Sequence, residues 1–294
     1  MSAGSLPCAV GFIGLGQIGA PMARRLRDWP GGLTVFDVVD AATEPFSRKG
    51  NRVAASPAEV AEHATVISLM VRDDAQVREV MSGRDGILTT AQPGTVIAIH
   101  STVEAHTPAE MADLAAARNV QVIDAPVSGG SMGAHGGTLA LMVGGSEQAV
   151  DAVREPFGRF ASLVAHLGPV GAGTRAKLAR NLITFASFAA VGEALRLAAA
   201  AGVDVVKLGD VVRHSDAVTG GPGAVMLRGD AAVLAVDDGL RPIFEHTRAL
   251  GEKDLDLALA LGASLGLELP VATLARQNLG AALGVPHDDH SENR

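Results

Sequence analysis

An apolar strand that runs directly into a glycine turn constrains this chain more than any other feature. Residues 9–13 read Ala-Val-Gly-Phe-Ile, and the spacing G-x-G-x-x-G follows before a helix expected from Pro21. In such a turn the first glycine permits the tight bend, the second lets the backbone approach a pyrophosphate, and the third lets helix and strand pack closely. The N–H groups that open the helix attract phosphate. The pattern therefore predicts that a dinucleotide binds at Gly14, Leu15, Gly16, Gln17, Ile18 and Gly19.

An acidic residue stands where a dinucleotide site of this kind needs one. Asp37 ends the expected strand 33–36 and follows the third glycine at about the 20-residue spacing of such sites. A carboxylate there accepts hydrogen bonds from ribose hydroxyls and repels a 2′-phosphate. Because Val38 and Val39 come next, rather than an arginine, NAD is favoured over NADP as the cofactor. The alternative is a purely structural glycine turn beside a solvated aspartate.

The two parts of the chain differ in pattern. With 294 residues, two domains are favoured over one. Up to residue 168, β-rich runs alternate with helical stretches, which predicts a Rossmann-type α/β domain with a mostly parallel sheet. From residue 169 to 294 the pattern predicts an all-helical domain. Strands are expected at 9–13, 33–36, 66–70, 96–99, 121–124 and 139–143, early helices at 21–27, 57–62, 76–81, 108–118 and 147–157, and later ones at 174–201, 205–214, 248–262 and 269–283.

Composition excludes several classes of partner. A net charge of −8 argues against nucleic-acid binding and against adsorption to anionic membranes. The apolar stretch 182–191 is too short to span a bilayer, and we expect it in a buried helix. Cys8 is the single cysteine, and the first residues lack the features of a signal peptide, so a reducing, cytoplasmic location is expected.

Two segments carry residues suited to chemistry on a small carboxylate. Ser128, Gly129 and Gly130 follow the expected strand 121–124, at the sheet edge where α/β proteins bind ligands. A hydroxyl and open backbone N–H groups there could hold a carboxylate, although a simple turn explains them equally well. Lys177 and Asn181 lie four residues apart on one face of the expected long helix.

A lysine on an apolar helix can act as an acid and a base. Burial lowers a lysine pKa, which suits Lys177 to proton transfer, whereas Arg175 and Arg180 keep their protons. A solvated surface lysine is the alternative reading of Lys177. The histidines and the one cysteine form no zinc-type ligand spacing, and no GxSxG turn is present, so no metal site is expected.

Six segments in fixed order are similar to motifs of one enzyme family. They read GFIGLGQIGAPMA at 11–23, HSTV at 100–103, DAPVSGG at 124–130, GTLALMVGG at 137–145, GAGTRAKLARN at 171–181 and KDLDLAL at 253–259. Together they resemble the β-hydroxyacid dehydrogenase family, within the 6-phosphogluconate dehydrogenase NAD-binding superfamily. The resemblance covers nearly the whole chain. It implies hydride transfer between NAD and a small 3-hydroxy acid, similar to 3-hydroxyisobutyrate, or its semialdehyde.

The resemblance also implies roles for individual residues. Lys177 would be the general acid and base, and Ser128, Gly129 and Gly130 would hold the substrate carboxylate with help from Asn181. The cofactor would also lie near residues outside the glycine turn, namely Met70, Val71, Thr102 and Val103. Lys253 would reach the cofactor or close the cleft, and a solvated lysine on a charged helix face is its alternative reading. Such enzymes are typically homodimers or homotetramers packed through the helical domain, which agrees with the apolar long helix.

Two departures from the family pattern leave the substrate open. Arg72 follows the Met70-Val71 strand end where a Leu-Pro-Asn type of sequence is common, and His100 stands where an aspartate or serine is frequent. Arg72, near the nicotinamide, could alter the charge preference for substrate, and both differences leave the substrate, but not the reaction class, in doubt. Alternative functions are an imine reductase, which generally lacks a lysine at position 177, and a catalytically silent dinucleotide-binding module.

Overall fold

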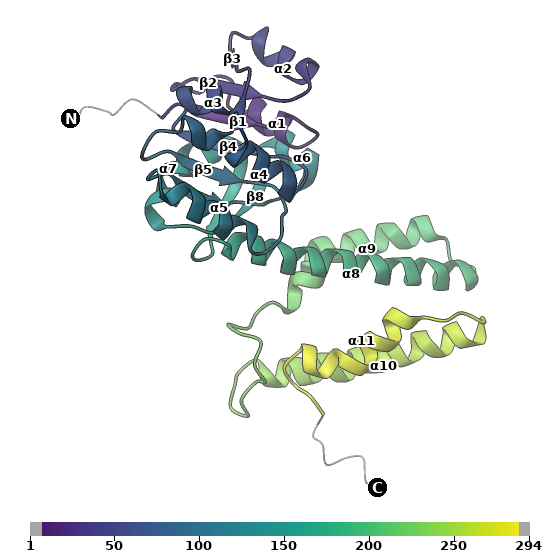
Figure 1. The fold of residues 1–294 in the computed structure, drawn as a ribbon. Coiled ribbons are helices and arrows are strands. Elements are labelled where there is room, and N and C mark those ends of the chain that lie inside the picture. The colour runs from purple at the N-terminus through teal and green to yellow at the C-terminus, as the bar shows by residue number, and fades with distance from the viewer. Residues whose placement is uncertain (1–7, 288–294) are drawn as a thin grey trace, which may run out of the picture. The chain divides into compact units, whose positions relative to one another are not determined.

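The computed structural model describes residues 8–287, which fall into two compact units that divide between Arg180 and Asn181. The division lies inside helix α8 (Ala172–Ala200), so this one helix contributes residues to both units. We refer to them as the α/β unit and the helical unit, and Figure 1 shows their elements along the chain.

A six-stranded parallel sheet forms the centre of the α/β unit. Its strands lie in the order β3-β2-β1-β4-β5-β6, the arrangement of a Rossmann-type domain. The strands are β1 (Val10–Ile13), β2 (Leu33–Phe36), β3 (Arg52–Val53), β4 (Val66–Leu69), β5 (Val96–Ile99) and β6 (Gln121–Asp124).

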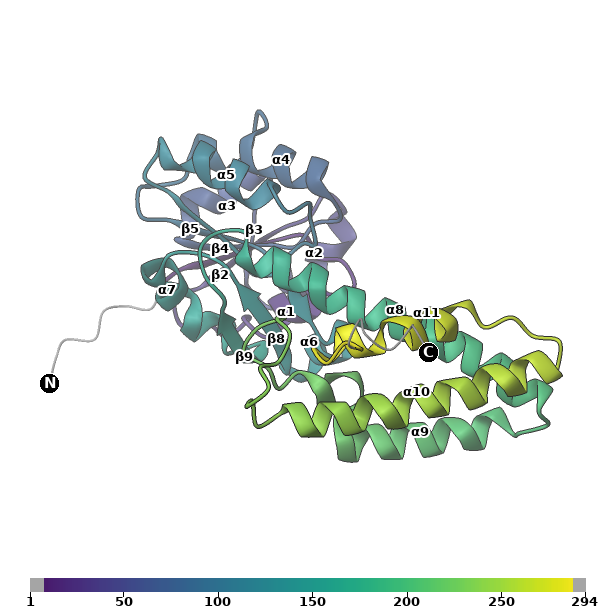
Figure 2. The ribbon, with the colours of Figure 1, turned by 90° about the horizontal axis from the view of Figure 1, so that it is seen from below.

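Alternation along each strand builds a core on both faces of this sheet. Within β5, Val96 and Ala98 join one buried cluster while Ile97 and Ile99 join another, because successive side chains point to opposite faces. One face is covered by α1 (Gly19–Arg24), α6 (Gly130–Gly136) and α7 (Glu147–Phe157), and the other by α3 (Pro57–His63), α4 (Asp74–Ser82) and α5 (Thr107–Ala116). Figure 2 shows the two helix layers on either side of the sheet.

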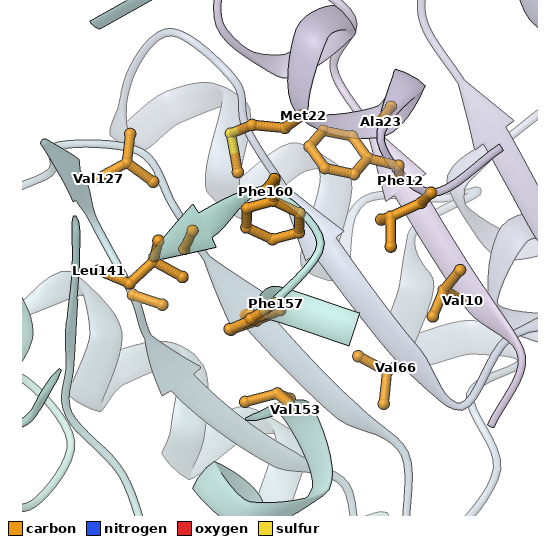
Figure 3. Close-up of a cluster of buried hydrophobic side chains, with 14 of the residues drawn as sticks. Val10, Phe12, Met22, Ala23, Val66, Val127, Leu141, Val153, Phe157 and Phe160 are labelled. Carbon is orange, nitrogen blue, oxygen red and sulfur yellow. The ribbon is translucent and has the colours of Figure 1, made fainter. Parts of the chain in front are cut away.

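The buried cluster that contains Val96 and Ala98 also contains several fully buried phenylalanine side chains. Phe12, Phe157 and Phe160 pack with Met22 beneath α1 and α7, and all four are fully buried (Figure 3). This packing fixes the glycine turn that follows β1, because both flanking elements are anchored in the same core.

The expected strand 139–143 does not join the parallel sheet. It forms β8 (Leu139–Val143), the middle strand of a separate sheet with β7 (Val127–Ser128) and β9 (Ala161–His166). β7 runs antiparallel to β8, and a bridge between Asp124 and Gly144 links this sheet to the end of β6. The chain therefore turns back after β6 rather than continuing the parallel order.

The helical unit consists of the later part of α8 with three further helices. These are α9 (Val205–Thr219), α10 (Arg241–Ser264) and α11 (Pro270–Ala282), and no strand occurs among the described residues after 180. α10 and α11 lie side by side (Figures 1 and 2). A small core forms around Phe244 and Val285. The remaining elements of the chain are α2 (Asp40–Ser47) and the 3-10 turns η1 (Ile87–Thr89) and η2 (Gly221–Val225).

The prediction of a buried helix over 182–191 is wrong for the single chain. Leu182, Phe185 and Phe188 are 72%, 61% and 64% exposed. By length and composition alone α8 could also cross a membrane, which the shorter stretch 182–191 did not indicate. Both parts of α8 are nevertheless tied to folded elements, its first turn through Asp124 and its later part through Glu193.

Candidate active site

The sequence-predicted residues of the α/β unit gather at one edge of the sheet. Because its strands are parallel, their carboxyl ends meet at the same edge. The glycine turn, Asp37, Met70 and Thr102 follow β1, β2, β4 and β5 there. Backbone hydrogen bonds continue beyond the strands, from Gly14 N to Phe36 O at 3.0 Å and from Met70 N to Ile13 O at 2.8 Å.

Each glycine of the turn stands in a distinct environment. Gly14 has φ +93°, and a Cβ there would collide with the carbonyl oxygen of Met70. A Cβ at Gly19 would collide with Gly14 O, so this glycine permits the close approach of α1. At Gly16 a Cβ would meet nothing within 4 Å. Gly14 and Gly19 are therefore required by the fold. Gly16 instead leaves open space above the backbone, as the approach of a pyrophosphate requires.

Asp37 is tied to the glycine turn by both carboxylate oxygens. Leu15 N donates to Oδ2 at 2.6 Å, and Val39 N donates to Oδ1 at 2.8 Å. Each oxygen keeps further acceptor capacity, because a carboxylate oxygen has two lone pairs. The carboxylate is thus held in a fixed orientation, half-buried, with acceptors left for a ligand hydroxyl.

A cavity of about 520 Å³ lies beside Asp37. That volume is typical of a small-molecule site. Its wall includes Gly16, Met70 and Val71 from the predicted cofactor residues, together with apolar side chains of β2 and α4. The lining is mostly apolar and includes the carboxylates of Asp37 and Glu79, a combination that suits a nucleoside, so these residues fit a dinucleotide. Arg72 also lines this cavity, 80% exposed and paired with Asp73 at 2.9 Å, so it shares a wall with Asp37.

His100 is a core residue and does not face a ligand. Its side chain is buried, with Nδ1 2.7 Å from Ala125 O and Nε2 3.0 Å from Ser68 Oγ. Phe12, Phe157 and Phe160 surround the ring. Desolvation lowers its pKa to about 4. His100 therefore gives no direct reason to expect a different substrate.

The segment after β5 is fixed to the segment after β4 by Ser101, which sequence reasoning overlooked. Val71 N donates to Ser101 Oγ at 3.0 Å, and that hydroxyl donates to Val71 O at 2.7 Å. Of the two predicted cofactor residues that follow, Thr102 is exposed and Val103 is buried. The hydroxyl pair thus holds the predicted cofactor segments 70–71 and 102–103 together.

The predicted carboxylate clamp begins at the end of β7. Ser128 is half-buried, and Gly129 and Gly130 have φ values of +125° and +61°, which favour glycine. Ser131 Oγ donates to Gln17 O at 3.2 Å, which joins this loop to the glycine turn. The structure thus brings the predicted substrate loop and the predicted cofactor turn together.

Lys177 lies in the second turn of α8 and is 9% exposed. Burial lowers its pKa, and the nearby charge of Arg180 lowers it further. A buried amine with a lowered pKa is suited to accept and donate a proton. The alternative of a solvated surface lysine does not agree with this burial.

The first turn of α8 rests on a buried carboxylate that sequence reasoning did not single out as functional. Gly171 N donates to Asp124 Oδ1 at 2.6 Å, and Thr174 N donates to Oδ2 at 2.5 Å. Asp124 has no exposed surface. Its position at a strand end could have drawn attention, but its partners lie about 50 residues further along the chain.

The other two predicted site residues belong to the helical unit. Asn181 follows Lys177 by one turn of α8 and is half-buried. Lys253 on α10 is 61% exposed and pairs with Asp254 at 2.9 Å. Their roles toward cofactor and substrate stay predictions. Among residues 8–287, no group of three or more His, Cys, Asp or Glu side chains comes together to hold a metal.

Comparison with known proteins agrees with this geometry in both parts of the chain. Residues 9–168 match the family model described as the NAD binding domain of 6-phosphogluconate dehydrogenase. Residues 171–293 match the NAD-binding model of NADP-dependent 3-hydroxyisobutyrate dehydrogenase. The fold and the two matches define an oxidoreductase that binds a nicotinamide dinucleotide.

Individual relatives extend over nearly the full chain. An uncharacterised oxidoreductase of Mycobacterium tuberculosis is 55% identical over 280 residues, covering 95% of each chain. A solved Mycobacterium avium structure is 51% identical with TM-score 0.90, covering 95% of this chain and 99% of the other. The structure of M. tuberculosis 3-hydroxyisobutyrate dehydrogenase with L-serine is 29% identical with TM-score 0.65, covering 95% of both. The chain belongs to the β-hydroxyacid dehydrogenase family.

Proposed function

We propose that the protein transfers a hydride between NAD and a small 3-hydroxy acid or its semialdehyde, with Lys177 as general acid and base. The observation that carries this proposal is the burial of Lys177, whose pKa is lowered, on a helix anchored at the carboxyl edge of the sheet. The related 3-hydroxyisobutyrate dehydrogenase structure with L-serine supports the substrate class, because 3-hydroxyisobutyrate and L-serine are both 3-hydroxy carboxylates.

Proton transfer is the step assigned to Lys177. In the oxidation direction the neutral amine at Nζ takes the proton of the substrate hydroxyl, and in the reduction direction the ammonium returns it. A lowered pKa increases the neutral fraction near neutral pH, which favours the first of these. When bound, the nicotinamide accepts or supplies the hydride.

Substrate binding is assigned to the loop that follows β7. The Ser128 hydroxyl and the backbone N–H groups of Gly129 and Gly130 would bind the carboxylate, with the Asn181 amide orienting the hydroxyl. This clamp is neutral, so it would bind the anion through hydrogen bonds alone. Ser131 supports the assignment, since its bond to Gln17 joins the loop to the cofactor turn.

Cofactor binding is assigned to the glycine turn, Asp37 and the cavity beside it, with NAD preferred over NADP. Asp37 supports this preference because its fixed carboxylate would bind ribose hydroxyls and repel a 2′-phosphate. Thr102, Val103 and Lys253 would make further cofactor contacts.

Turnover of a substrate panel tests the proposal. Purified protein is mixed with NAD and short 2-, 3- and 4-hydroxy acids, and with NADH and ketone–amine pairs, and NADH absorbance is followed. We expect NAD reduction with 3-hydroxy acids. Tight NADH binding without any turnover would favour a silent binding module, and turnover of the amine pairs alone would favour an imine reductase.

The assembly and location of the protein are also proposals. Apolar side chains exposed on α8, including Phe185 and Phe188, support a homodimer or homotetramer packed through the helical unit. The single cysteine supports a reducing compartment, the cytoplasm, which fractionation of cells would test. The net charge of −8 supports the absence of nucleic-acid and membrane partners.

A further inference from the structure

Asp124 is held in place by hydrogen bonds of both its backbone and its side chain. Its backbone pairs with Gly144 in both directions, at 3.0 Å and 2.8 Å, which anchors it to β8. Its carboxylate accepts from Gly171 N, directly before α8, and from Thr174 N in the first turn of α8. A buried carboxylate is costly unless it is hydrogen-bonded, and here helix N–H groups and the positive end of the helix dipole stabilise it.

Two glycines allow the first turn of α8 to pack closely against the strand ends. A Cβ at Gly173 would lie 2.8 Å from Asp124 O and 3.0 Å from Gly144 N. A Cβ at Gly144 would lie 2.8 Å from Ala172 N. Backbone therefore packs directly on backbone, so the first turn of α8 cannot move closer to the strand ends, and the Asp124 hydrogen bonds oppose movement away from them.

Lys177 lies close to this turn on the same helix. It lies three residues beyond Thr174, which is about 4.5 Å along the axis of an α-helix. A displacement of the first turn would therefore be transmitted almost in full to Lys177. Misplacement of a catalytic group by about 1 Å can reduce turnover about 100-fold.

We propose that Asp124 is a positioning residue for Lys177, because its buried carboxylate fixes the first turn of α8 to the end of β6 and so sets where the amine lies. This inference rests on the proposed role of Lys177 in proton transfer. Asp124 itself touches the helix backbone and is assigned no contact with substrate or cofactor.

Glu193 offers a matched control within the same chain. It is also a buried carboxylate at a helix N-terminus, accepting from Val271 N at 2.8 Å and Ala272 N at 3.0 Å. The helix that it caps, α11, carries none of the predicted site residues. Loss of either cap should lower stability, but only the loss of the Asp124 cap should alter Lys177.

The test compares Asp124→Asn with Glu193→Gln in the full-length protein. The amide side chain has the shape of the carboxylate that it replaces, but its NH2 group cannot accept a hydrogen bond from a backbone N–H. Each variant therefore loses one capping hydrogen bond. We expect kcat to fall about 100-fold in D124N with KM and the NADH dissociation constant changed less than about threefold. In E193Q, kcat should stay within about twofold of wild type.

A second readout needs no substrate. Competitive acetylation with acetic anhydride, read by mass spectrometry across a pH series, reports the pKa of each lysine amine. In D124N the pKa of Lys177 should rise toward the ordinary lysine value of 10.5, because a loosened helix admits water, and in E193Q it should stay lowered. If D124N does not fold, both measurements are made on Asp124→Ser, which keeps one capping oxygen.

The two proposals fail in distinguishable ways. Absence of turnover by the wild-type protein would overturn the proposed function, while the acetylation series would still report on the link between Asp124 and Lys177. Unchanged kcat and an unchanged Lys177 pKa in a folded Asp124 variant would overturn the positioning role. Equal effects of D124N and E193Q on both readouts would also overturn it, since they would show only a loss of stability.

Discussion

Asp37 combines a structural and a binding property in one carboxylate. Its hydrogen bonds from Leu15 N and Val39 N hold the turn. In the proposed cofactor site its charge would repel a 2′-phosphate. We predict that Asp37→Asn weakens NAD binding about 10-fold and weakens NADP binding less, because the repulsion is removed along with the acceptor.

Calorimetric titration of both dinucleotides checks this prediction. Asp40→Asn is the control, since Asp40 is a nearby exposed aspartate in the first turn of α2. If D37N and D40N keep the same NADP-to-NAD ratio as the wild-type protein, Asp37 does not determine cofactor choice.

Single residues differ in how far sequence could predict them. The glycine turn and Asp37 were predictable because their geometry depends on short, local spacing. Asp124 was not, because its role arises from contacts with residues about 50 positions away, which periodicity does not report. His100 was misread for the same reason, since whether a histidine faces a ligand or a core depends on tertiary packing.

His100 also joins three strands. Placed after β5, it contacts Ser68 on β4 and Ala125 after β6, and it is neutral because its pKa is about 4. In the unfolded chain its pKa is near 6.5, so below that pH the unfolded state binds a proton that the folded state does not. Stability from this group is therefore full above pH 6.5 and is lost as pH falls toward 4.

We predict that the folded state loses about 2 kcal/mol of stability through His100 between pH 7 and pH 5. Urea unfolding at both pH values measures the loss, which should be smaller by that amount in His100→Asn. His106→Asn, at an exposed histidine, should lose as much as wild type. A loss in H100N equal to that of wild type would contradict the assignment.

Secondary-structure elements were predictable where the hydrophobic pattern was long enough. The expected strands 33–36, 96–99 and 121–124 agree with β2, β5 and β6, and helix 147–157 agrees with α7. β3 and β7 have two residues each, too few for alternation to be seen. α6 reads Gly-Ser-Met-Gly-Ala-His-Gly, a composition that indicates a loop. The separate sheet around β8 follows from chain reversal after β6, which no local pattern encodes.

At the scale of the whole molecule, the apolar surface exposed on α8 favours self-association. Phe185 and Phe188 form an edge-to-face pair at 5.9 Å on an exposed face of α8. We predict that the wild-type protein sediments as a dimer or larger and that Phe185→Asp shifts it toward monomer at micromolar concentration. Leu114→Asp, at an exposed leucine of α5, should leave the assembly unchanged. A monomeric wild-type protein at tens of micromolar would contradict the proposal.

The proposed dehydrogenase activity depends on proton transfer by Lys177. The most direct measurement is single-turnover absorbance at 340 nm with Lys177→Ala and wild type, using the 3-hydroxy acid that turns over best. We predict a loss of at least about 1,000-fold in the rate, with the NADH dissociation constant changed less than about threefold, because the cofactor residues are untouched. Turnover by K177A at the wild-type rate would contradict the central claim.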